Sequence, residues 1–485
     1  MRKNREQLAM TQPSIYWHDY ETWGANPQKD LPCQFAGVRT DMDMNIIDKP
    51  LMIYSQIPSD YLPVPEACLI TCITPQLTLR DGMVEADFIH KIHQQFSKAN
   101  TCVAGYNNIR FDDEISRYTL YRNFYEPYGR EWQQGNSRWD IIDMMRACYA
   151  LRPEGIKWPI NDKGLPSFKL QDLTAENDIQ HQDAHDAMSD VYATIAVAKL
   201  IKNAQPKLFS FLFNLRFKAK VAELIDLNNM TPLVHVSSKI SAEQGCCTWI
   251  APICMHPDNK NAVIVLNLAL SPEPLLSMSA QELVEKLYRP NAMLAEGEQR
   301  LPIKLIHLNK CPVIAPAKTL TEENASRLGI DRAQCLQNLT LIKQHPEIKQ
   351  KLLKMYTRTE QRKELDPEHA LYSGGFFSDT DRKLIDQVRN ANEQELTELS
   401  LPFNDPRLTT LLFRYKARNY PQTLNAAEVD RWQQYRKFRL LEADSPASIK
   451  LPEYLQQLED LSNLHRQNPQ KLAILKALYN YAQDL

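Results

Sequence analysis

The 485-residue sequence contains no long uncharged apolar stretch. A segment that spans a bilayer needs about 20 consecutive apolar residues, and a secretory signal needs a shorter apolar run after a basic start. The charged N-terminal segment 1–7 is followed by neither. We therefore expect a cytoplasmic protein with no membrane partner.

The ten cysteines include no C-x-x-C pair, and they are scattered along the chain. Structural zinc sites and disulfide frameworks both depend on close or regular cysteine spacing. We expect reduced and mostly buried thiols. Low-complexity segments and solenoid repeats are also absent. The net charge of −2 does not identify a partner, because a near-neutral total can hide a basic groove.

The sequence contains enough hydrophobic residues to form several hydrophobic cores. Its length predicts about three domains, and its 43% hydrophobic and 24% charged residues are typical of a soluble globular protein. We place the first boundary at Gln205-Pro206. The expected domains are residues 14–204, 205–355 and 356–485.

The pattern in the first domain predicts an α/β fold. Three β-like runs, a helix and a fourth strand follow in the order β-β-β-α-β, which suggests an antiparallel meander before the helix. The expected strands begin at Ile15 and occupy 34–39, 51–54 and 101–106; the expected helices are 85–99, one opened by 107–114, 136–151 and 184–202.

The spacing of apolar residues changes in the later domains. From about residue 231 the apolar period becomes two, which predicts a small β-rich domain with helical insertions. Its expected strands are 233–236, 247–251, 262–266 and 303–308. Beyond about residue 320 the pattern is helical, and segment 371–377 interrupts it as a linker or an ordered loop.

The stretch His18-Asp19-Tyr20-Glu21-Thr22 ends the first expected strand. Alternation along a strand sends Asp19 and Glu21 to the same face, about 7 Å apart. Two such carboxylates suit a divalent metal ion. Alone they are better explained as solvated groups at a strand end, since Asp41-Met42-Asp43 repeats the spacing by chance.

Two further acidic motifs follow in the same domain. Asp112 stands in an F-D-x-E motif after the fourth strand, where helix capping is the simpler explanation. Residues 181–190 then contain two overlapping H-x4-D frames, His181 with Asp186 and His185 with Asp190. Context favours the second frame, because His185 begins an amphipathic helix and Asp190 projects from its second turn.

The order of these three motifs resembles the signature of the DEDDh exonuclease superfamily, which has a ribonuclease-H-like fold with a mixed sheet flanked by helices. In that resemblance four carboxylates bind the metal ions and one histidine is the general base. The carboxylates are Asp19, Glu21, Asp112 and Asp190, and the base is His185.

The chemistry of phosphodiester hydrolysis agrees with this set. Two hard cations about 4 Å apart, held by oxygen ligands, activate water and neutralise the growing charge. Asp19 can bridge the two ions, Glu21 and Asp190 complete one site, and Asp112 supports the other. Carboxylates favour Mg²⁺, with Mn²⁺ as a substitute. His185 titrates near neutrality and can accept the proton of the attacking water.

Longer stretches resemble the bacterial exonuclease I family in particular, over nearly all of the chain after residue 15. They include 105–114, 137–140, 145–155, 232–237, 375–379 and 415–419. The resemblance implies an exonuclease domain, an SH3-like β domain and a C-terminal helical domain around single-stranded DNA. It also implies a monomeric enzyme of DNA repair and recombination that degrades the strand processively from its 3′ end to nucleoside 5′-monophosphates.

Residues 117–132 interleave cations with aromatic side chains, a pattern that binds a strand of any sequence. Core packing is the commoner fate of such aromatics. The resemblance places further substrate contacts between the second and third motifs, where Lys169 stands in place of an expected arginine. The expected contacts with nucleic acid are Arg117, Tyr128, Trp132, Arg146, Arg152 and Lys169, followed by the basic group Arg216, Lys218 and Lys220.

The family also binds the acidic, Phe-ending tail of single-stranded DNA-binding protein in a basic pocket. Thr321 stands here where a cation is expected, although Lys310, Lys318 and Lys343 are near it in sequence. We expect this partner without assigning its residues.

Two other functions fit parts of the sequence. An RNA-trimming or proofreading member of the same superfamily needs only the first domain, so the two following domains would lack a reason. A catalytically silent DNA-binding scaffold would keep a cluster of buried acids together without using it, which is costly.

Overall fold

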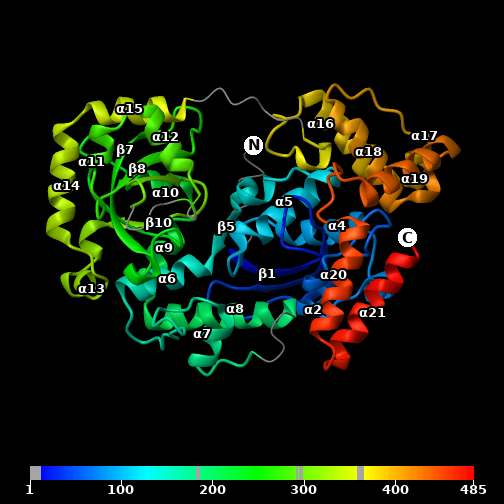
Figure 1. The fold of residues 1–485 in the computed structure, drawn as a ribbon, viewed down its shortest axis with the longest axis horizontal. Helices are drawn as coiled ribbons and strands as arrows, with labels where there is room; N and C mark the ends of the chain where they lie inside the picture. The colour runs from blue at the N-terminus through cyan, green and yellow to red at the C-terminus, as the bar shows by residue number, and fades with distance from the viewer. Residues whose placement is uncertain (1–11, 182–185, 291–292, 294–298, 358–364) are drawn as a thin grey trace. The chain divides into compact units, whose positions relative to one another are not determined.

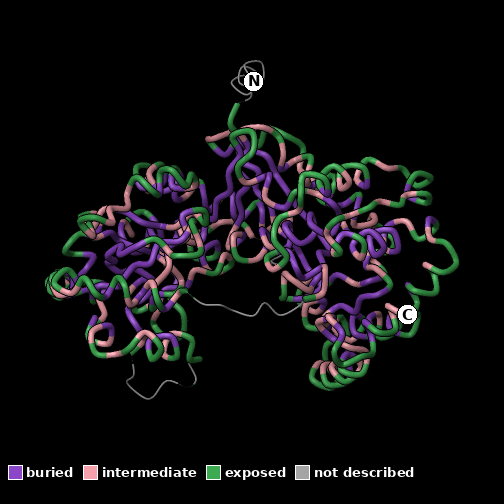
Figure 2. The backbone as a smooth tube through the Cα atoms, turned by 90° about the horizontal axis from the view of Figure 1, so that it is seen from above, coloured by how far each residue is buried: buried purple, intermediate pink, exposed green. Residues whose placement is uncertain are grey.

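The computed structural model describes residues 12–181, 186–290, 293, 299–357 and 365–485 (Figure 1). The described residues form two compact units. Unit 1 comprises residues 12–137, the described part of 181–192, and 365–485, while unit 2 comprises 138–180 and the described part of 193–361. Within each unit, buried backbone lies inside and exposed backbone lies at the periphery (Figure 2).

The first sheet is mixed and five-stranded, in the order β3-β2-β1-β4-β5. β1 pairs antiparallel with β2 and parallel with β4, and β2 pairs antiparallel with β3. The predicted meander followed by a helix and a fourth strand is confirmed. The strands are β1 (Ser14–Thr22), β2 (Pro32–Thr40), β3 (Leu51–Tyr54), β4 (Thr101–Gly105) and β5 (Ser137–Asp140).

One face of this sheet is covered by α4 (Glu85–Phe96) and α5 (Asp112–Arg122). Phe88, Ile92 and Phe96 of α4 are fully buried against Tyr16 and other apolar residues of the sheet. The spacing of these residues places them on one stripe of the helix, as the sequence predicts. The even-numbered residues of β1 face this core, so its odd-numbered residues face the other way.

The remaining helices of the first half include three that the sequence analysis missed, α2, α3 and α7. All three are short, and α2 and α3 begin with proline, whose fixed backbone angle suits the first helical position. The expected helix 136–151 is partly wrong, because its first residues form β5. The helices are α2 (Pro65–Thr71), α3 (Pro75–Asp81), α6 (Ile141–Leu151), α7 (Leu170–Glu176) and α8 (Ala187–Ala204).

Unit 2 is built on a five-stranded antiparallel sheet in the order β10-β6-β7-β8-β9. The sequence predicts four of these strands and misses β10, which is short. The strands are β6 (Leu233–Val236), β7 (Cys247–Met255), β8 (Ala262–Asn267), β9 (Ile303–His307) and β10 (Val313–Pro316). The helices are α9 (Pro206–Asn214), α10 (Lys218–Ala222), α11 (Glu273–Ser277), α12 (Ala280–Tyr288), α13 (Glu322–Arg327), α14 (Arg332–Gln344) and α15 (Glu347–Tyr356).

The C-terminal part of unit 1 is helical, as expected. It comprises α16 (Asp379–Asn390), α17 (Glu393–Glu398), α18 (Pro406–Asn419), α19 (Ala426–Leu441), α20 (Leu451–Leu464) and α21 (Pro469–Gln483). Apolar residues of α20 and α21 pack against Trp23, Leu31 and Tyr61. The described helices include none with the length and apolarity needed to cross a membrane.

A buried ion network ties these helices to the N-terminal part of unit 1. Arg418 donates to both oxygens of Asp60, at 3.0 and 2.8 Å, and to Glu368. Arg439 approaches the same two carboxylates at 3.2 and 3.3 Å. Burial alone would raise the pKa of Asp60, but Arg418 and Arg439 lower it below its ordinary value. The same balance holds the pKa of Glu368 well below its usual range.

Replacing Arg418 by methionine is expected to destabilise unit 1 by about 3–5 kcal/mol, because it leaves Asp60 and Glu368 buried without their main cation. Both carboxylates have folded-state pKa values below those of the unfolded chain. Their stabilisation is therefore present at neutral pH and is lost as the pH falls through the acidic range. Urea unfolding of the wild type and R418M at neutral and acid pH measures both effects.

The matched control is Arg382→Met, which removes an exposed ion pair with Asp379. We expect it to leave the unfolding midpoint unchanged. An R418M protein as stable as this control would contradict the role of the network.

Candidate active site

Three of the predicted carboxylates converge in unit 1. Asp19 and Glu21 lie on one face of β1, and Asp190 comes from the first turn of α8. One ligand oxygen from each of the three lies within 4.8 Å of the other two. Side chains about 170 residues apart in sequence therefore meet at a separation that one cation can bridge.

The fourth carboxylate, Asp112, lies beside this group. It begins α5 and is 5% exposed, and its Oδ1 accepts a hydrogen bond of 3.1 Å from the backbone N–H of Tyr20. The hydroxyl of Ser116 donates to that of Tyr20 at 3.0 Å and holds α5 on the same strand. The peptide between Asp19 and Glu21 thus fixes the position of Asp112.

The electrostatics of the cluster are unfavourable without a cation. Burial raises the pKa of Asp19 well above its ordinary value, and Asp112, Glu21 and Asp190 raise it further. Burial also raises the pKa of Glu21 to about 9, with Asp190 and Asp112 as the next causes. The strongest neighbouring charges on both groups are negative, so the fold brings together acids that repel one another.

This donor set fits a hard divalent cation. It offers oxygen ligands only, and the mutual repulsion of the carboxylates would be relieved by positive charge between them. Asp19, Glu21 and Asp190 would hold one ion, and Asp112 stands next to them to support a second. The residues present therefore fit the expected metal.

His185, the expected general base, lies outside the described residues. The histidine of the other frame, His181, is described, and its Nε2 lies 2.5 Å from Oδ1 of Asp190. The structure thus brings the histidine of the first H-x4-D frame to the aspartate of the second. The sequence analysis gave no sign of this contact.

A fifth carboxylate, Asp186, also lies near the cluster. It raises the pKa of both Asp19 and Glu21. Its Oδ2 accepts from the N–H of Ser189 at 3.1 Å, which caps α8, and Gln34 donates to its Oδ1 at 3.3 Å. Gln34 pairs with Glu21 across β1 and β2. Only the register of the two strands could have revealed Gln34 as a neighbour of the site.

Three of the expected nucleic-acid contacts lie in unit 1. Trp132 is 66% exposed, whereas Tyr128 is half-buried. Arg117 is buried, and its guanidinium binds both oxygens of Glu131 at 2.8 and 2.9 Å and also contacts Glu114. The guanidinium carbon of Arg117 lies 5.3 Å from the ring centroid of Tyr128. The interleaved pattern of cations and aromatics therefore contains both packed residues, such as Arg117, and exposed ones, such as Trp132.

The other six expected contacts belong to unit 2, and they differ in exposure. Arg146 is buried beside Asp143, and Arg152 is half-buried and donates to the carbonyl of Thr319 at 3.0 Å. Arg216 stacks on Phe213, with 3.7 Å from its guanidinium carbon to the ring centroid. The exposed residues are Lys169, Lys218 and Lys220.

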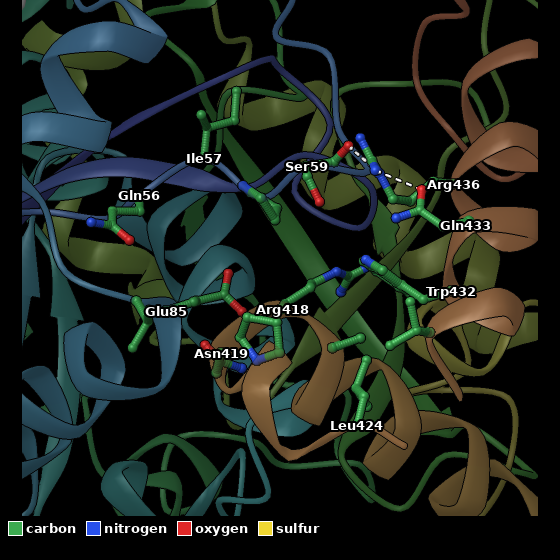
Figure 3. Close-up of a pocket in the computed structure, with 15 residues that line it drawn as sticks. Gln56, Ile57, Ser59, Glu85, Arg418, Asn419, Leu424, Trp432, Gln433 and Arg436 are labelled. Atoms are coloured by element: carbon green, nitrogen blue, oxygen red, sulfur yellow. Dashed lines mark hydrogen bonds between the residues drawn. The ribbon is translucent and has the colours of Figure 1, made fainter. Parts of the chain in front are cut away.

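A pocket of about 350 Å³ lies elsewhere in unit 1, between segment 56–59 and the helices α4, α18 and α19 (Figure 3). Arg436 donates across it to the carbonyl of Ser59 at 3.0 Å and to Gln433 at 2.8 Å. None of the four predicted metal carboxylates lines it. Its charged residues Arg418 and Glu85 are already paired, and Arg436 donates to the carbonyls of Ser59 and Leu485, so the pocket displays no particular ligand chemistry.

Comparison with known families gives three consecutive matches. A model described as Exonuclease matches residues 16–198, one described as Exonuclease I SH3-like domain matches residues 216–358, and one described as Exonuclease I C-terminal domain matches residues 365–485. Together they cover most of the chain.

Two curated relatives are similar over almost the whole length. The chain is 46% identical to exodeoxyribonuclease I of Escherichia coli (strain K12) over 478 residues, which is 98% of each chain. It is 47% identical to exodeoxyribonuclease I of Haemophilus influenzae over 473 residues, which is 97% of this chain and 98% of the relative.

Solved structures of E. coli exonuclease I are similar in fold. The complex with a dA16 oligonucleotide has a TM-score of 0.94 at 47% identity and covers 98% of this chain and 100% of that one. A zinc-bound complex with single-stranded DNA has a TM-score of 0.93, and a structure of SSB and exonuclease I with an inhibitor has 0.90. Both are 46% identical and cover 98% of this chain; the zinc-bound complex is covered over 99% of its chain and the structure with SSB over 100%.

Glu21→Gln is expected to stabilise the metal-free protein and to weaken its response to metal. The folded-state pKa of Glu21, about 9, lies above that of the unfolded chain, so the metal-free protein loses stability as the pH rises toward 9. At 100-fold excess over Kd, a bound ion should stabilise the wild type by about 2.7 kcal/mol. Thermal unfolding at pH 8 with EDTA, Mg²⁺ or Mn²⁺ measures these effects.

Asp43→Asn is the control, since Asp43 is an exposed carboxylate at a turn. It should leave the metal response intact. An equal metal-induced shift in E21Q and the wild type would show that Glu21 does not hold the ion.

Proposed function

This chain belongs to the exonuclease I family, and we propose that it degrades single-stranded DNA processively from the 3′ end to nucleoside 5′-monophosphates in DNA repair and recombination. It is an exodeoxyribonuclease with an exonuclease domain, an SH3-like domain and a C-terminal helical domain. We place the domain edges at residues 14–204, 205–355 and 356–485, and expect a cytoplasmic monomer.

The observation that carries the proposal is the convergence of Asp19, Glu21 and Asp190 within 4.8 Å, with Asp112 fixed beside them. A nuclease of this class needs a place where two cations meet the scissile phosphate. We assign Mg²⁺ to this place, with Mn²⁺ as a substitute, because the ligands are all carboxylates. The structural relative with zinc and single-stranded DNA supports a divalent ion in this family.

Each residue then has a separate task. Asp19, central on β1, would bridge the ions, and Glu21 and Asp190 would complete the first site while Asp112 supports the second. When bound, the ions lower the pKa of water and neutralise charge on the phosphate. His185 would accept the proton of the attacking water. His181, hydrogen-bonded to Asp190, would fix the orientation of that carboxylate.

We propose that the strand is bound by the residues expected from the sequence to contact nucleic acid. Trp132 is exposed and can stack on a base, and Arg117 lies over the ring of the half-buried Tyr128. Phosphates would be met by the cations of unit 2, namely Arg146, Arg152, Lys169, Arg216, Lys218 and Lys220. A lysine at 169 provides a point charge instead of a bidentate contact. The structural relative with a dA16 oligonucleotide supports this substrate class.

We also propose the tail of single-stranded DNA-binding protein as a partner. One structural relative contains SSB together with exonuclease I. An acidic tail that ends in phenylalanine needs cations beside an apolar pocket. In unit 2, Lys318 lies in the short turn after β10, and Lys343 lies in the last turn of α14.

Asp190→Asn should abolish hydrolysis while leaving strand binding measurable, because it removes a metal ligand and no strand contact. The assay uses 5′-labelled single-stranded DNA and RNA of the same sequence, with Mg²⁺ and then with EDTA. We expect shortening of the DNA from its 3′ end only when the metal is present. Preference for RNA would favour an RNA-trimming enzyme, and a wild type without activity would favour a scaffold.

Variants of the two histidines distinguish a general base from a residue that orients a metal ligand, in the same assay. His185→Gln should lower kcat by about 10²- to 10⁴-fold, as for loss of a general base. His181→Gln should weaken metal affinity by about 10- to 100-fold, and excess metal should restore its kcat. The reverse pattern would exchange the two assignments.

Binding of the acidic, Phe-ending tail should depend on the charge of the protein surface and on the salt concentration. A fluorescent peptide with an acidic, Phe-ending tail should bind the enzyme at low salt and dissociate as salt is added. Lys318→Glu should weaken binding by reversing a charge, whereas Lys157→Glu, an exposed cation elsewhere in unit 2, should not. A peptide with its final phenylalanine removed should not bind. Failure of the full peptide at low salt would exclude this partner.

A further inference from the structure

A buried glutamine lies on β2 beside the carboxylate cluster. All residues of β2 are buried, and Gln34 is 2% exposed. In the register of the first sheet it stands opposite Glu21 on β1 and opposite Tyr54 on β3. Cross-strand partners share a face of the sheet, so Gln34 lies on the face that carries Glu21. A buried amide costs free energy unless it is hydrogen-bonded, so the partners of Gln34 show what it holds.

The amide of Gln34 is bonded to β3 and to the start of α8. Its Nε2 donates to the hydroxyl of Tyr54 at 3.1 Å and to Oδ1 of Asp186 at 3.3 Å. Its Oε1 accepts from the backbone N–H of Ala187 at 3.3 Å. A glutamine amide has two N–H donors and one carbonyl, so these contacts use both donors and the acceptor. Gln34 thus connects the edge strand of the sheet to α8.

The N-terminus of α8 is capped by two different elements. The first four N–H groups of a helix have no acceptor within it. In α8, Ser189 donates to Oδ2 of Asp186, which is a local cap, whereas Ala187 donates to Gln34, which lies 153 residues earlier in the chain. A cap from a neighbouring strand stabilises the helix and also fixes its position against that strand. The start of α8 is therefore held on β2 by Gln34.

The first turn of α8 carries a carboxylate of the cluster. The backbone N–H of Asp190 donates to the carbonyl of Asp186 at 3.0 Å, so the two residues lie one helical turn apart. Asp190 is one of the three residues whose ligand oxygens lie within 4.8 Å of one another. Asp186 also follows His185, the general base of the proposed reaction, in the sequence. A displacement of Asp186 would therefore displace Asp190 as well.

Asp186 brings a fifth negative charge close to the cluster. It raises the pKa of Asp19 and of Glu21, yet it is not one of the three described residues whose ligand oxygens meet within 4.8 Å. Hydrogen bonds occupy both of its carboxylate oxygens, Oδ2 with the N–H of Ser189 and Oδ1 with Gln34.

Repulsion between Asp186 and the other acids favours a movement of this carboxylate away from the site. Its two hydrogen bonds oppose that movement, and one of them comes from Gln34. An amide suits this task better than a cation, because it donates to Asp186 without adding a positive charge that would compete with a bound metal ion. The residue type at position 34 is thus matched to a site that a cation must enter.

We propose that Gln34 is a positioning residue of the active site. By holding Asp186 and the N–H of Ala187, it fixes the start of α8 on β2, so that Asp190 stays in place to bind a cation together with the carboxylates of β1. The inference rests on the proposed function. At 2% exposure, Gln34 acts through its hydrogen-bond partners and not on the strand.

The first test uses Gln34→Met, which keeps the length of the side chain and removes its amide. The Kd for Mn²⁺, measured by titration calorimetry, should rise by about 10- to 100-fold, because Asp190 is no longer held in place. With the metal in excess, kcat should stay about 10- to 100-fold below that of the wild type, since small displacements of reacting groups are costly. The Kd for single-stranded DNA in EDTA should not change.

Asn419→Leu is the matched control. Asn419 is a buried amide of the same unit, and it lines the pocket of Figure 3 instead of the carboxylate cluster. Its Oδ1 accepts from the backbone N–H of Ala86 in the first turn of α4, and its Nδ2 donates to the carbonyl of Tyr415, both at 2.9 Å. Thermal unfolding should show a similar loss of stability in N419L and Q34M. N419L should keep the wild-type Kd for Mn²⁺ and the wild-type kcat.

The second test exchanges the amide and the acid. Gln34→Glu keeps an acceptor for the N–H of Ala187 but turns a second carboxylate toward Asp186, so it should impair metal binding and turnover more than Q34M does. The double variant Q34E/D186N restores a donor–acceptor pair with its direction reversed and the total charge of the wild type. It should recover most of the activity lost in Q34E, and failure to recover would overturn the inference. This pair of variants decides the question by itself if Q34M does not fold.

The outcomes distinguish this inference from the function on which it rests. A wild type that binds Mn²⁺ and degrades DNA, with Q34M equal to it in both, overturns the positioning role alone. Equal losses in Q34M and N419L overturn it as well, because the loss then follows stability, and so does a weaker Kd for DNA in Q34M. A wild type that binds Mn²⁺ more tightly than Q34M but degrades no DNA overturns the proposed function and supports the positioning of Asp190.

Discussion

The repulsion among buried carboxylates at the end of β1 is the constraint on which the site depends. Strand alternation places Asp19 and Glu21 on one face, and the helices α5 and α8 add Asp112 and Asp190. Burial raises the pKa of the two β1 carboxylates, and their acidic neighbours raise it further. Bringing these carboxylates together costs free energy that the rest of the fold must offset. A bound cation is the simplest way to reduce that cost.

The same unit contains buried acids with the opposite electrostatics. Asp60 and Glu368 are more deeply buried than Asp19, yet their pKa values are lowered because three arginines surround them. Both clusters come from the same kinds of element, a loop or strand and the ends of helices. The difference is that arginines lie against Asp60 and Glu368, whereas the strongest charges beside Asp19 and Glu21 are those of other acids. The buried acids Asp60 and Glu368 therefore stabilise the fold through ion pairs. The acids at the end of β1 have no such partners among their strongest neighbours and instead suit a bound cation.

The sequence predicted the parts of the site that depend on local periodicity. The alternation in β1, the helix start at Asp112 and the helix that carries Asp190 needed only short-range patterns, and the first four strands followed from the same signals. β5 was taken as helix because Trp139 fits a helical stripe equally well. The contact of Gln34 with Asp186, and that of His181 with Asp190, depend on strand register and loop path, which no local pattern contains.

The exposure of individual side chains was least accessible from sequence. Arg117 has the composition and setting of a phosphate contact, but in the structure it is buried and divides its donors among Glu131, Glu114 and Tyr372. Phe376 lies in a segment that the sequence predicts to be a linker or an ordered loop, and the structure shows an ordered loop on which Phe376 is exposed. The exposure of both residues depends on their tertiary surroundings. Arg117 contacts acids from its own half of the chain, whereas Phe376 contacts solvent.

These two residues also explain why the C-terminal helices accompany the exonuclease fold. α5 begins at Asp112, and its next turn holds the loop 371–377 through Glu114, Arg117 and Tyr121. Arg407 holds the other side of that loop from α18. The helix that positions Asp112 is thus clamped by residues more than 250 positions later in the chain. Removing the C-terminal part would expose one side of α5 and loosen the support of Asp112, so the geometry of the carboxylate cluster depends on the C-terminal helices as well as on the first sheet.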